Sequence, residues 1–149
     1  MSLTEKISSD LMNAMKARDK VALEAIRAAK TAFTLARSDK GADSVLTAEE
    51  ELKIIQKLVK QRRESAAIYK ENNRQDLYEK EVAEADVLEK YLPAKMNEAE
   101  LEKVLKEIIE KAGAKSPADM GKVMGIATKE LAGKADGKEI SAKVKQLLG

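Results

Sequence analysis

The sequence predicts an all-α fold made of two small helical subdomains. Two prolines and seven glycines are the only strong helix breakers among the 149 residues, and alanine, leucine, lysine and glutamate dominate the rest. Apolar residues make up 44% of the chain, yet it has one Phe, three Tyr and no Trp. The core is therefore expected to consist of aliphatic side chains on closely packed helices.

The first helices follow from apolar spacing and capping residues. Apolar side chains at helical intervals predict a helix over residues 3–18. Asp19 can cap a second helix, which runs to about residue 37 and whose buried face is rich in alanine. Small side chains allow short distances between helices, so this helix is expected to be central to its bundle. Residues 38–46 are expected to form a loop.

Two longer helices complete the first subdomain. Thr47 and Glu50 have the spacing of a capping box and predict a third helix that ends near Asn72. A fourth helix is expected from about Asn73 to about Leu92. Four helices thus occupy residues 1–92.

Pro93 sets the predicted boundary, because the residue before a proline is biased out of helical conformation. Residues 93–149 are expected to form the second subdomain, with three to four helices. Caps and breakers predict where these helices start and end. These residues are, in chain order, Asn97, Gly113, Ser116, Gly133 and Asp136.

The net charge of +2 conceals two clusters of opposite sign. Residues 53–74 carry seven lysines or arginines against two acids, and residues 75–92 carry six acids against two lysines. Such helices can attract each other or a partner. The exposed cations of the third helix could follow a nucleic-acid backbone or form an ordinary solvated face. This basic ridge comprises Lys53, Lys57, Lys60, Arg63, Lys70 and Arg74.

One charged residue lies within the apolar face of each of these two helices. Arg62 interrupts the face of the third helix and Glu81 that of the fourth. An unpaired buried charge is costly, so we expect Arg62 and Glu81 to form a structural ion pair, or Glu84 to take the place of Glu81. Binding of a substrate is the alternative role.

Two glycines lie one turn apart in the helix that follows Ser116. Gly121 and Gly125 each cost about 1 kcal/mol relative to alanine inside a helix. They project to one side of the apolar face, next to Lys122 and Lys129. The smooth strip can seat a phosphate backbone, or it can let another helix of the same subdomain pack closely.

The composition excludes several classes of chemistry. With no cysteine and no histidine, the chain has no thiol or imidazole chemistry, no disulfide and none of the usual zinc ligands, so no metal or cofactor is expected. The N-terminus has no apolar signal segment and no run approaches membrane-spanning length, so a cytoplasmic protein without membrane partners is expected.

Nearly the whole chain resembles a YqeY-like protein of the GatB/YqeY group. The individual motifs are short, but together and in order they are specific. One departure is Ala28-Ala29 after Arg27, where bulkier apolar residues are common. The matching motifs are Ala14-Met15-Lys16-Ala17-Arg18-Asp19-Lys20, Arg27-x-x-Lys30, Lys60-Gln61-Arg62-Arg63-Glu64-Ser65, Arg74-x-Asp76-Leu77, Glu81-x-x-Glu84, Tyr91-Leu92-Pro93, Asp119-Met120-Gly121-Lys122-Val123-Met124-Gly125 and Gly133-Lys134-Ala135-Asp136-Gly137.

The resemblance implies two all-helical subdomains, the second similar to the tail of the B subunit of the tRNA-dependent amidotransferase. In that enzyme the tail recognises tRNA, and the chemistry lies in other domains and subunits. The resemblance therefore implies a tRNA-binding or RNA-binding accessory protein of translation. The residues expected to face nucleic acid are Gly121, Lys122, Gly125, Lys129, Lys134, Asp136 and Gly137.

Family labels also speak of a carbon–nitrogen ligase with glutamine as amido-N-donor. Amide transfer needs a nucleophile that releases ammonia and a phosphate site that activates the acceptor. The sequence has no cysteine, no Ser-x-x-x-Lys arrangement in a glycine-rich loop and no Walker-type loop, so no catalytic residue is predicted. A module that docks on an amidotransferase or a synthetase is the remaining alternative.

Overall fold

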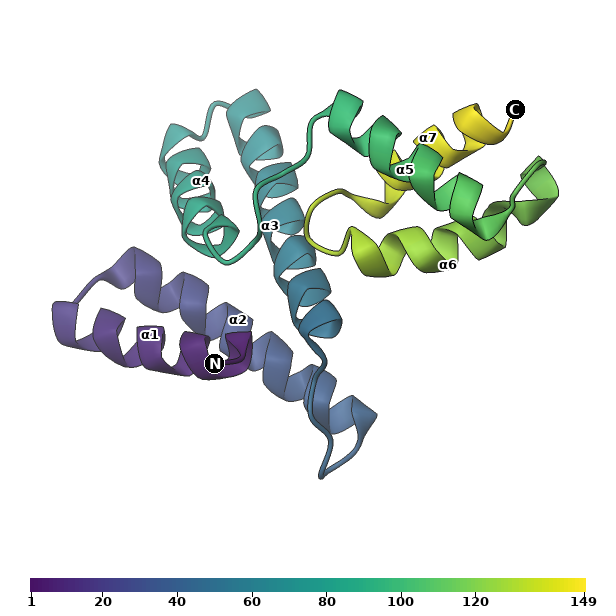
Figure 1. Cartoon of the computed structure of the whole chain (residues 1–149). Coiled ribbons are helices and arrows are strands. Elements are labelled where there is room, and N and C mark those ends of the chain that lie inside the picture. Colours follow the sequence, from purple (N-terminus) through teal and green to yellow (C-terminus); the bar gives the residue numbers. More distant parts are fainter. The chain divides into compact units, whose positions relative to one another are not determined.

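The computed structural model describes all 149 residues as seven α-helices and one short 3-10 helix, without strands (Figure 1). The all-α prediction is confirmed. The chain divides into two compact units, Met1–Leu92 and Pro93–Gly149. The elements are α1 (Leu3–Ala17), α2 (Lys20–Lys40), α3 (Ala48–Glu71), α4 (Gln75–Glu89), α5 (Glu98–Ala112), η1 (Pro117–Asp119), α6 (Met120–Glu130) and α7 (Gly137–Leu148).

The first unit contains two helix pairs, α1 with α2 and α3 with α4, and α2 also packs on α4. Its core is aliphatic apart from Phe33, and Ile7, Ile55 and Leu88 are completely buried. The alanine face of α2 lies in this core, with Ala25 also fully buried. Small side chains thus bring α2 close to its neighbours, as the sequence predicts.

Capping explains most helix starts in this unit. The Asp19 carboxylate accepts a hydrogen bond from the Ala22 amide at 3.1 Å. Thr47 and Glu50 form the predicted capping box. The predicted loop over residues 38–46 begins too early, because α2 continues to Lys40. There the Lys40 ammonium holds the helix end against α3, 2.7 Å from the Glu50 carboxylate.

The fourth helix is shorter than predicted. It begins at Gln75 and ends at Glu89, and residues 90–92 form turns before Pro93. Asn73 adopts a positive φ of 58° in the tight connection between α3 and α4. The two helices therefore run antiparallel, and α4 lies against the C-terminal part of α3.

The second unit packs α5, α6 and α7 around a separate core. Leu105, Val123 and Val144 are completely buried in it. The carbonyl of Lys134 accepts a hydrogen bond from the Met96 amide at 3.1 Å, which ties the segment before α5 to the α6–α7 connection. Gly113 ends α5 in the left-handed conformation, with φ of 67°.

The start of the sixth helix differs from the prediction. Ser116 precedes a 3-10 turn, and its hydroxyl makes no capping hydrogen bond. The local bond is made instead by the Asp119 carboxylate, which accepts from the Lys115 amide at 3.0 Å. Regular α-helix begins at Met120.

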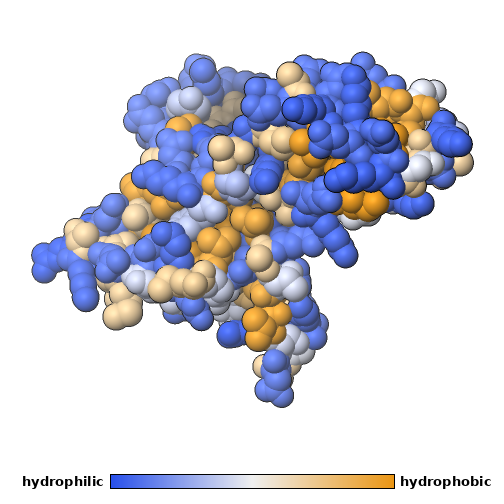
Figure 2. All heavy atoms as spheres, viewed as in Figure 1, coloured by the Kyte–Doolittle hydropathy of each residue, from blue (hydrophilic) through white to orange (hydrophobic).

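No helix of the structure combines the length and the apolar character that crossing a bilayer requires. Figure 2 shows hydrophilic side chains over much of one face, with hydrophobic atoms between them. The exposed large apolar side chains are scattered along α1, α2 and α3 and the α2–α3 loop. They include Met12, Met15, Val21, Leu35, Val45 and Ile68.

Candidate functional site

The strip on α6 that the sequence predicts is open to solvent. Gly121, Gly125, Lys122 and Lys129 are all exposed, while Val123 on the other side of the helix is completely buried. A Cβ atom on either glycine would meet no other atom within 4 Å. The glycines therefore do not serve close packing inside the unit, and this excludes the alternative that another helix of the unit lies against them.

The two lysines flank the glycines on one side of the helix. At about 100° per residue, Lys122 and Lys129 differ by only about 20° in direction, and Gly125 lies between them along the axis. Thr128 borders the strip, and its hydroxyl donates to the Met124 carbonyl at 2.8 Å. We call Gly121, Lys122, Gly125, Thr128 and Lys129 the α6 strip.

The connection after α6 contributes one further cation. Lys134 is exposed, and its amide donates to the Leu131 carbonyl at 2.9 Å. Asp136 is the N-cap of α7 and accepts from the Lys138 amide at 3.4 Å, and Gly137 is the first residue of that helix. Asp136 thus has a structural role as a cap, whereas the Lys134 side chain has none in the unit.

The lysines of this region differ from the basic ridge in their electrostatic surroundings. Lys122, Lys129 and Lys134 take part in no ion pair. On the ridge, the Lys53 ammonium lies 2.8 Å from the Glu49 carboxylate, and Arg63 pairs with both Asp86 and Glu89 of α4. Arg74 pairs with Asp76 at 3.3 Å, and Lys60 also has a partner. Most of the ridge charge is therefore engaged by other groups of the chain.

The buried charge on α3 is paired with Glu84. The Arg62 Nε lies 3.6 Å from a carboxylate oxygen of Glu84, and it has no hydrogen-bond partner of its own. Glu84 is 6% exposed, whereas Glu81 is only half-buried. The alternative partner named from the sequence is the one the structure shows. Arg62 and Glu84 are equally far along the chain from Asn73, so the antiparallel hairpin places them opposite each other.

Glu84 belongs to a small charged cluster with Glu24 and Lys80. Burial raises the pKa of Glu84, and a hydrogen bond with Glu24 raises it further. The same bond, together with Lys80, lowers the pKa of Glu24. The Lys80 ammonium lies 3.2 Å from the Glu24 carboxylate. The two carboxyl groups are therefore shifted in opposite directions, Glu84 toward its protonated form and Glu24 toward its ionised form.

Two buried charges are absent from the residues predicted from the sequence. Lys143 is 9% exposed, and its ammonium lies 3.0 Å from the Glu98 carboxylate. Glu51 is 3% exposed on α3. Both could have been found by spacing, because Glu51 precedes Ile55 by four residues and Lys143 follows Ile140 by three, so each projects toward a core face.

Two comparisons with known proteins each match nearly the whole chain. Residues 4–148 match the model of the family described as Yqey-like protein. A relative from Pyrenophora tritici-repentis (strain Pt-1C-BFP), named altered inheritance of mitochondria protein 41, mitochondrial, is 31% identical over 150 residues. That match covers 97% of this chain and 80% of the relative.

Proposed function

Since the chain belongs to the YqeY-like family, we propose that it is a non-catalytic accessory protein of translation whose C-terminal unit binds tRNA or another folded RNA. The observation that carries this proposal is the α6 strip. Gly121 and Gly125 keep a helix face bare where no other part of the C-terminal unit comes close, and unpaired lysines flank that face. A partner from outside the chain accounts for both features.

The chemistry of the strip suits a phosphate backbone. RNA duplexes are recognised mainly by shape and by contacts to phosphates and 2′-hydroxyls. Bare glycines let a helix backbone approach such a surface, and Lys122 and Lys129 are placed to neutralise phosphates on it. Lys134, in the turn after α6, adds a third unpaired charge.

The resemblance to the amidotransferase tail supports the same assignment, because the tail recognises tRNA while other domains perform the chemistry. The proposal places the protein in a compartment where tRNA is charged, as the cytoplasm is. The name of the fungal relative assigns that protein to mitochondria.

Fluorescence anisotropy with labelled bulk tRNA across a salt series tests the proposal. We expect affinity that falls steeply with salt. Replacing Lys122 and Lys134 with alanine should weaken binding to all tRNAs alike and make the slope of log affinity against log salt shallower by about 1.5 to 2. The matched control replaces Lys103 and Lys111 with alanine. These are two exposed lysines of α5 without ion pairs, so the net charge changes equally.

Three results would contradict the proposal. Absence of binding at low salt would do so, as would unchanged binding by the double variant or equal losses in variant and control. In a pull-down with this chain, an amidotransferase or synthetase that stays bound after nuclease treatment and in moderate salt would instead assign the strip to a protein partner. Glutamine-dependent release of ammonia by the purified chain would show that it is an enzyme.

A further inference from the structure

The outer face of α2 carries three cations that serve neither the core nor the proposed function. Between residues 25 and 38 this helix has Arg27, Lys30 and Arg37 and no acid. All three are exposed, and none of them forms an ion pair. The pair Arg27-x-x-Lys30 is one of the motifs that carry the family resemblance, and the α6 strip gives it no role. We call Arg27, Lys30, Thr31, Thr34 and Arg37 the α2 stripe.

The members of the α2 stripe share one side of the helix. At about 100° per residue they lie within an arc of about 120°, and the buried Ala25 and Ala29 project to the opposite side. At a rise of 1.5 Å per residue, the ten steps from Arg27 to Arg37 span about 15 Å. A row of cations of this length matches a run of several phosphates better than a single small anion.

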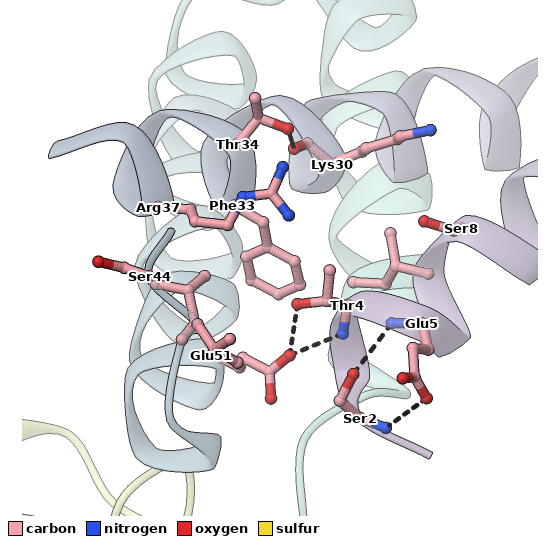
Figure 3. Close-up of a pocket in the computed structure, with 13 residues that line it drawn as sticks. Ser2, Thr4, Glu5, Ser8, Lys30, Phe33, Thr34, Arg37, Ser44 and Glu51 are labelled. Carbon is pink, nitrogen blue, oxygen red and sulfur yellow. Dashed lines mark hydrogen bonds between the residues drawn. The ribbon is translucent and has the colours of Figure 1, made fainter. Parts of the chain in front are cut away.

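The surface along the stripe is hollowed. A shallow groove of about 330 Å³ is lined by Leu35 and by every member of the stripe except Arg37. A pocket of about 310 Å³ lies beside Glu51, between the first turns of α1, the α2–α3 loop and the start of α3, and α2 contributes Lys30, Thr34 and Arg37 to it (Figure 3). Lys30 and Thr34 line both hollows, so the groove and the pocket adjoin along α2.

The carboxylate in the pocket is held by groups of α1. Glu51 is 3% exposed, and it accepts hydrogen bonds from the Thr4 amide at 2.7 Å and from the Thr4 hydroxyl at 2.6 Å. In Figure 3 the Lys30 ammonium extends away from Glu51, and the Phe33 ring lies between Glu51 and the Arg37 guanidinium. Glu51 therefore engages neither cation of the stripe.

Two exposed acids near the stripe are also engaged by other groups. Glu5 completes the capping box of α1. Glu24, three residues before Arg27, lies 3.2 Å from the Lys80 ammonium. A hydrogen bond with Glu84 and the contacts with Lys80 lower the pKa of Glu24 more than Arg27 does. The positive charge of the stripe is therefore available to an anion from outside the chain.

We propose that the α2 stripe binds the phosphate backbone of RNA and gives the N-terminal unit an RNA contact of its own. The class of partner rests on the proposed function, whereas the surface is separate from the α6 strip. Three unpaired cations along about 15 Å of helix can neutralise successive phosphates. The stripe has no aromatic side chain to stack on unpaired bases, so the contact is made to the backbone.

Thr34 favours RNA over other polyanions. Its hydroxyl donates to the Lys30 carbonyl at 2.9 Å, so toward a ligand it can only accept a hydrogen bond. The RNA backbone supplies such donors, because each ribose carries a 2′-hydroxyl beside the phosphates. The backbone of DNA has no 2′-hydroxyl, and the carboxylates of an acidic protein surface only accept.

Fluorescence anisotropy of the full chain with labelled bulk tRNA across a salt series tests the proposal. The stripe variant replaces Arg27, Lys30 and Arg37 with glutamine. We expect it to bind about tenfold more weakly or worse, and to make the slope of log affinity against log salt shallower by about 2 to 2.7. A second variant, Arg27→Lys with Arg37→Lys, should bind like the wild type, because phosphates accept either cation.

The matched control removes three other exposed cations of the N-terminal unit that form no ion pair, so the net charge changes equally. They are Lys16, Arg18 and Lys90. The control should bind at least fivefold more tightly than the stripe variant. Equal losses in the two would overturn the proposal. Unchanged binding by the stripe variant would also overturn it, and would leave an acidic protein surface as the occupant of the stripe.

The α6 variant, with Lys122 and Lys134 replaced by alanine, separates this inference from the proposed function. If it loses affinity in the same series and the stripe variant does not, the α2 stripe is excluded and the proposed function stands. If only the stripe variant loses affinity, the N-terminal contact stands and the RNA contact of the α6 strip is refuted.

Discussion

Replacing both α6 glycines with alanine separates the two explanations for their presence. Each added methyl group enters open space, because no atom would lie within 4 Å of a Cβ on either residue. Alanine also removes the helix penalty of glycine, which is about 1 kcal/mol at Gly125 and less at Gly121 in the first turn. We therefore expect the double variant to stabilise the C-terminal unit by about 1–1.5 kcal/mol.

Thermal unfolding followed by far-UV circular dichroism measures this gain. A unit of roughly 60 residues should show a rise in Tm of about 4–8 °C for each 1 kcal/mol. The same protein should bind tRNA less tightly than the wild type, because methyl groups on the strip hold an RNA backbone away. Gly125→Gln extends the test with a larger, uncharged helix former, and we expect it to weaken binding further, by about fivefold to tenfold.

The prediction is therefore a gain of stability together with a loss of binding. A fall in stability would mean that Gly121 or Gly125 contacts another part of the chain, contrary to the open space around both. A gain in stability with unchanged tRNA affinity would leave the glycines without a role in recognition. Either result refutes the reasoning that connects the bare strip to a partner.

Two further predictions concern the N-terminal unit. Tyr91→Phe should destabilise it by about 1.5 kcal/mol in urea unfolding, because the Tyr91 hydroxyl donates to the Asp10 carboxylate at 2.5 Å. For Glu84, burial raises the folded-state pKa above the ordinary 4.5, so its protonated form stabilises the fold and this contribution is lost as pH rises through the raised value. Glu84→Gln should abolish the loss of stability that this group causes as pH rises above 4.5.

Each of these has an internal control. Tyr69→Phe removes a hydroxyl that makes no hydrogen bond and should change stability by less than about 0.5 kcal/mol. An equal cost for both tyrosine variants would exclude the Asp10 bond as the cause. Glu24 titrates in the opposite sense, since its pKa is lowered: its contribution to stability is present above pH 4.5 and is lost as pH falls. An unchanged pH profile in Glu84→Gln would show that Glu84 is ionised throughout.

The helices can be predicted because their signals are local. Asp19, the Thr47–Glu50 box, Asn97 and Gly113 each act within a few residues of their position, and each caps the helix expected of it. The predicted end of α2 is wrong because Lys40 reaches Glu50, ten residues ahead, and that contact depends on how α2 meets α3. Local patterns do not contain such information.

The ion pair of Arg62 shows what helical periodicity can predict and what it cannot. Helical periodicity places Arg62 and Glu81 on apolar faces, but it does not say which residues of two helices lie opposite each other. The turn at Asn73 decides this, because positions equally distant from it meet in the hairpin, and that rule selects Glu84. The pocket beside Glu51 needs still more, since it combines segments of α1, α2 and α3 whose arrangement is tertiary.

The distribution of paired and unpaired charges is what distinguishes the surfaces of this molecule. The sequence shows two basic regions but does not say which of them is more available to a phosphate. That depends on which acidic side chains lie near each lysine or arginine in space. In the structure Arg63 is bound by two acids of α4, so an RNA phosphate there would have to displace them. Lys122 and Lys129 have no such competitors, and a phosphate gains their full attraction. Recognition should therefore follow the region with fewer cations, and the salt slope measured for lysine variants of each region decides between them.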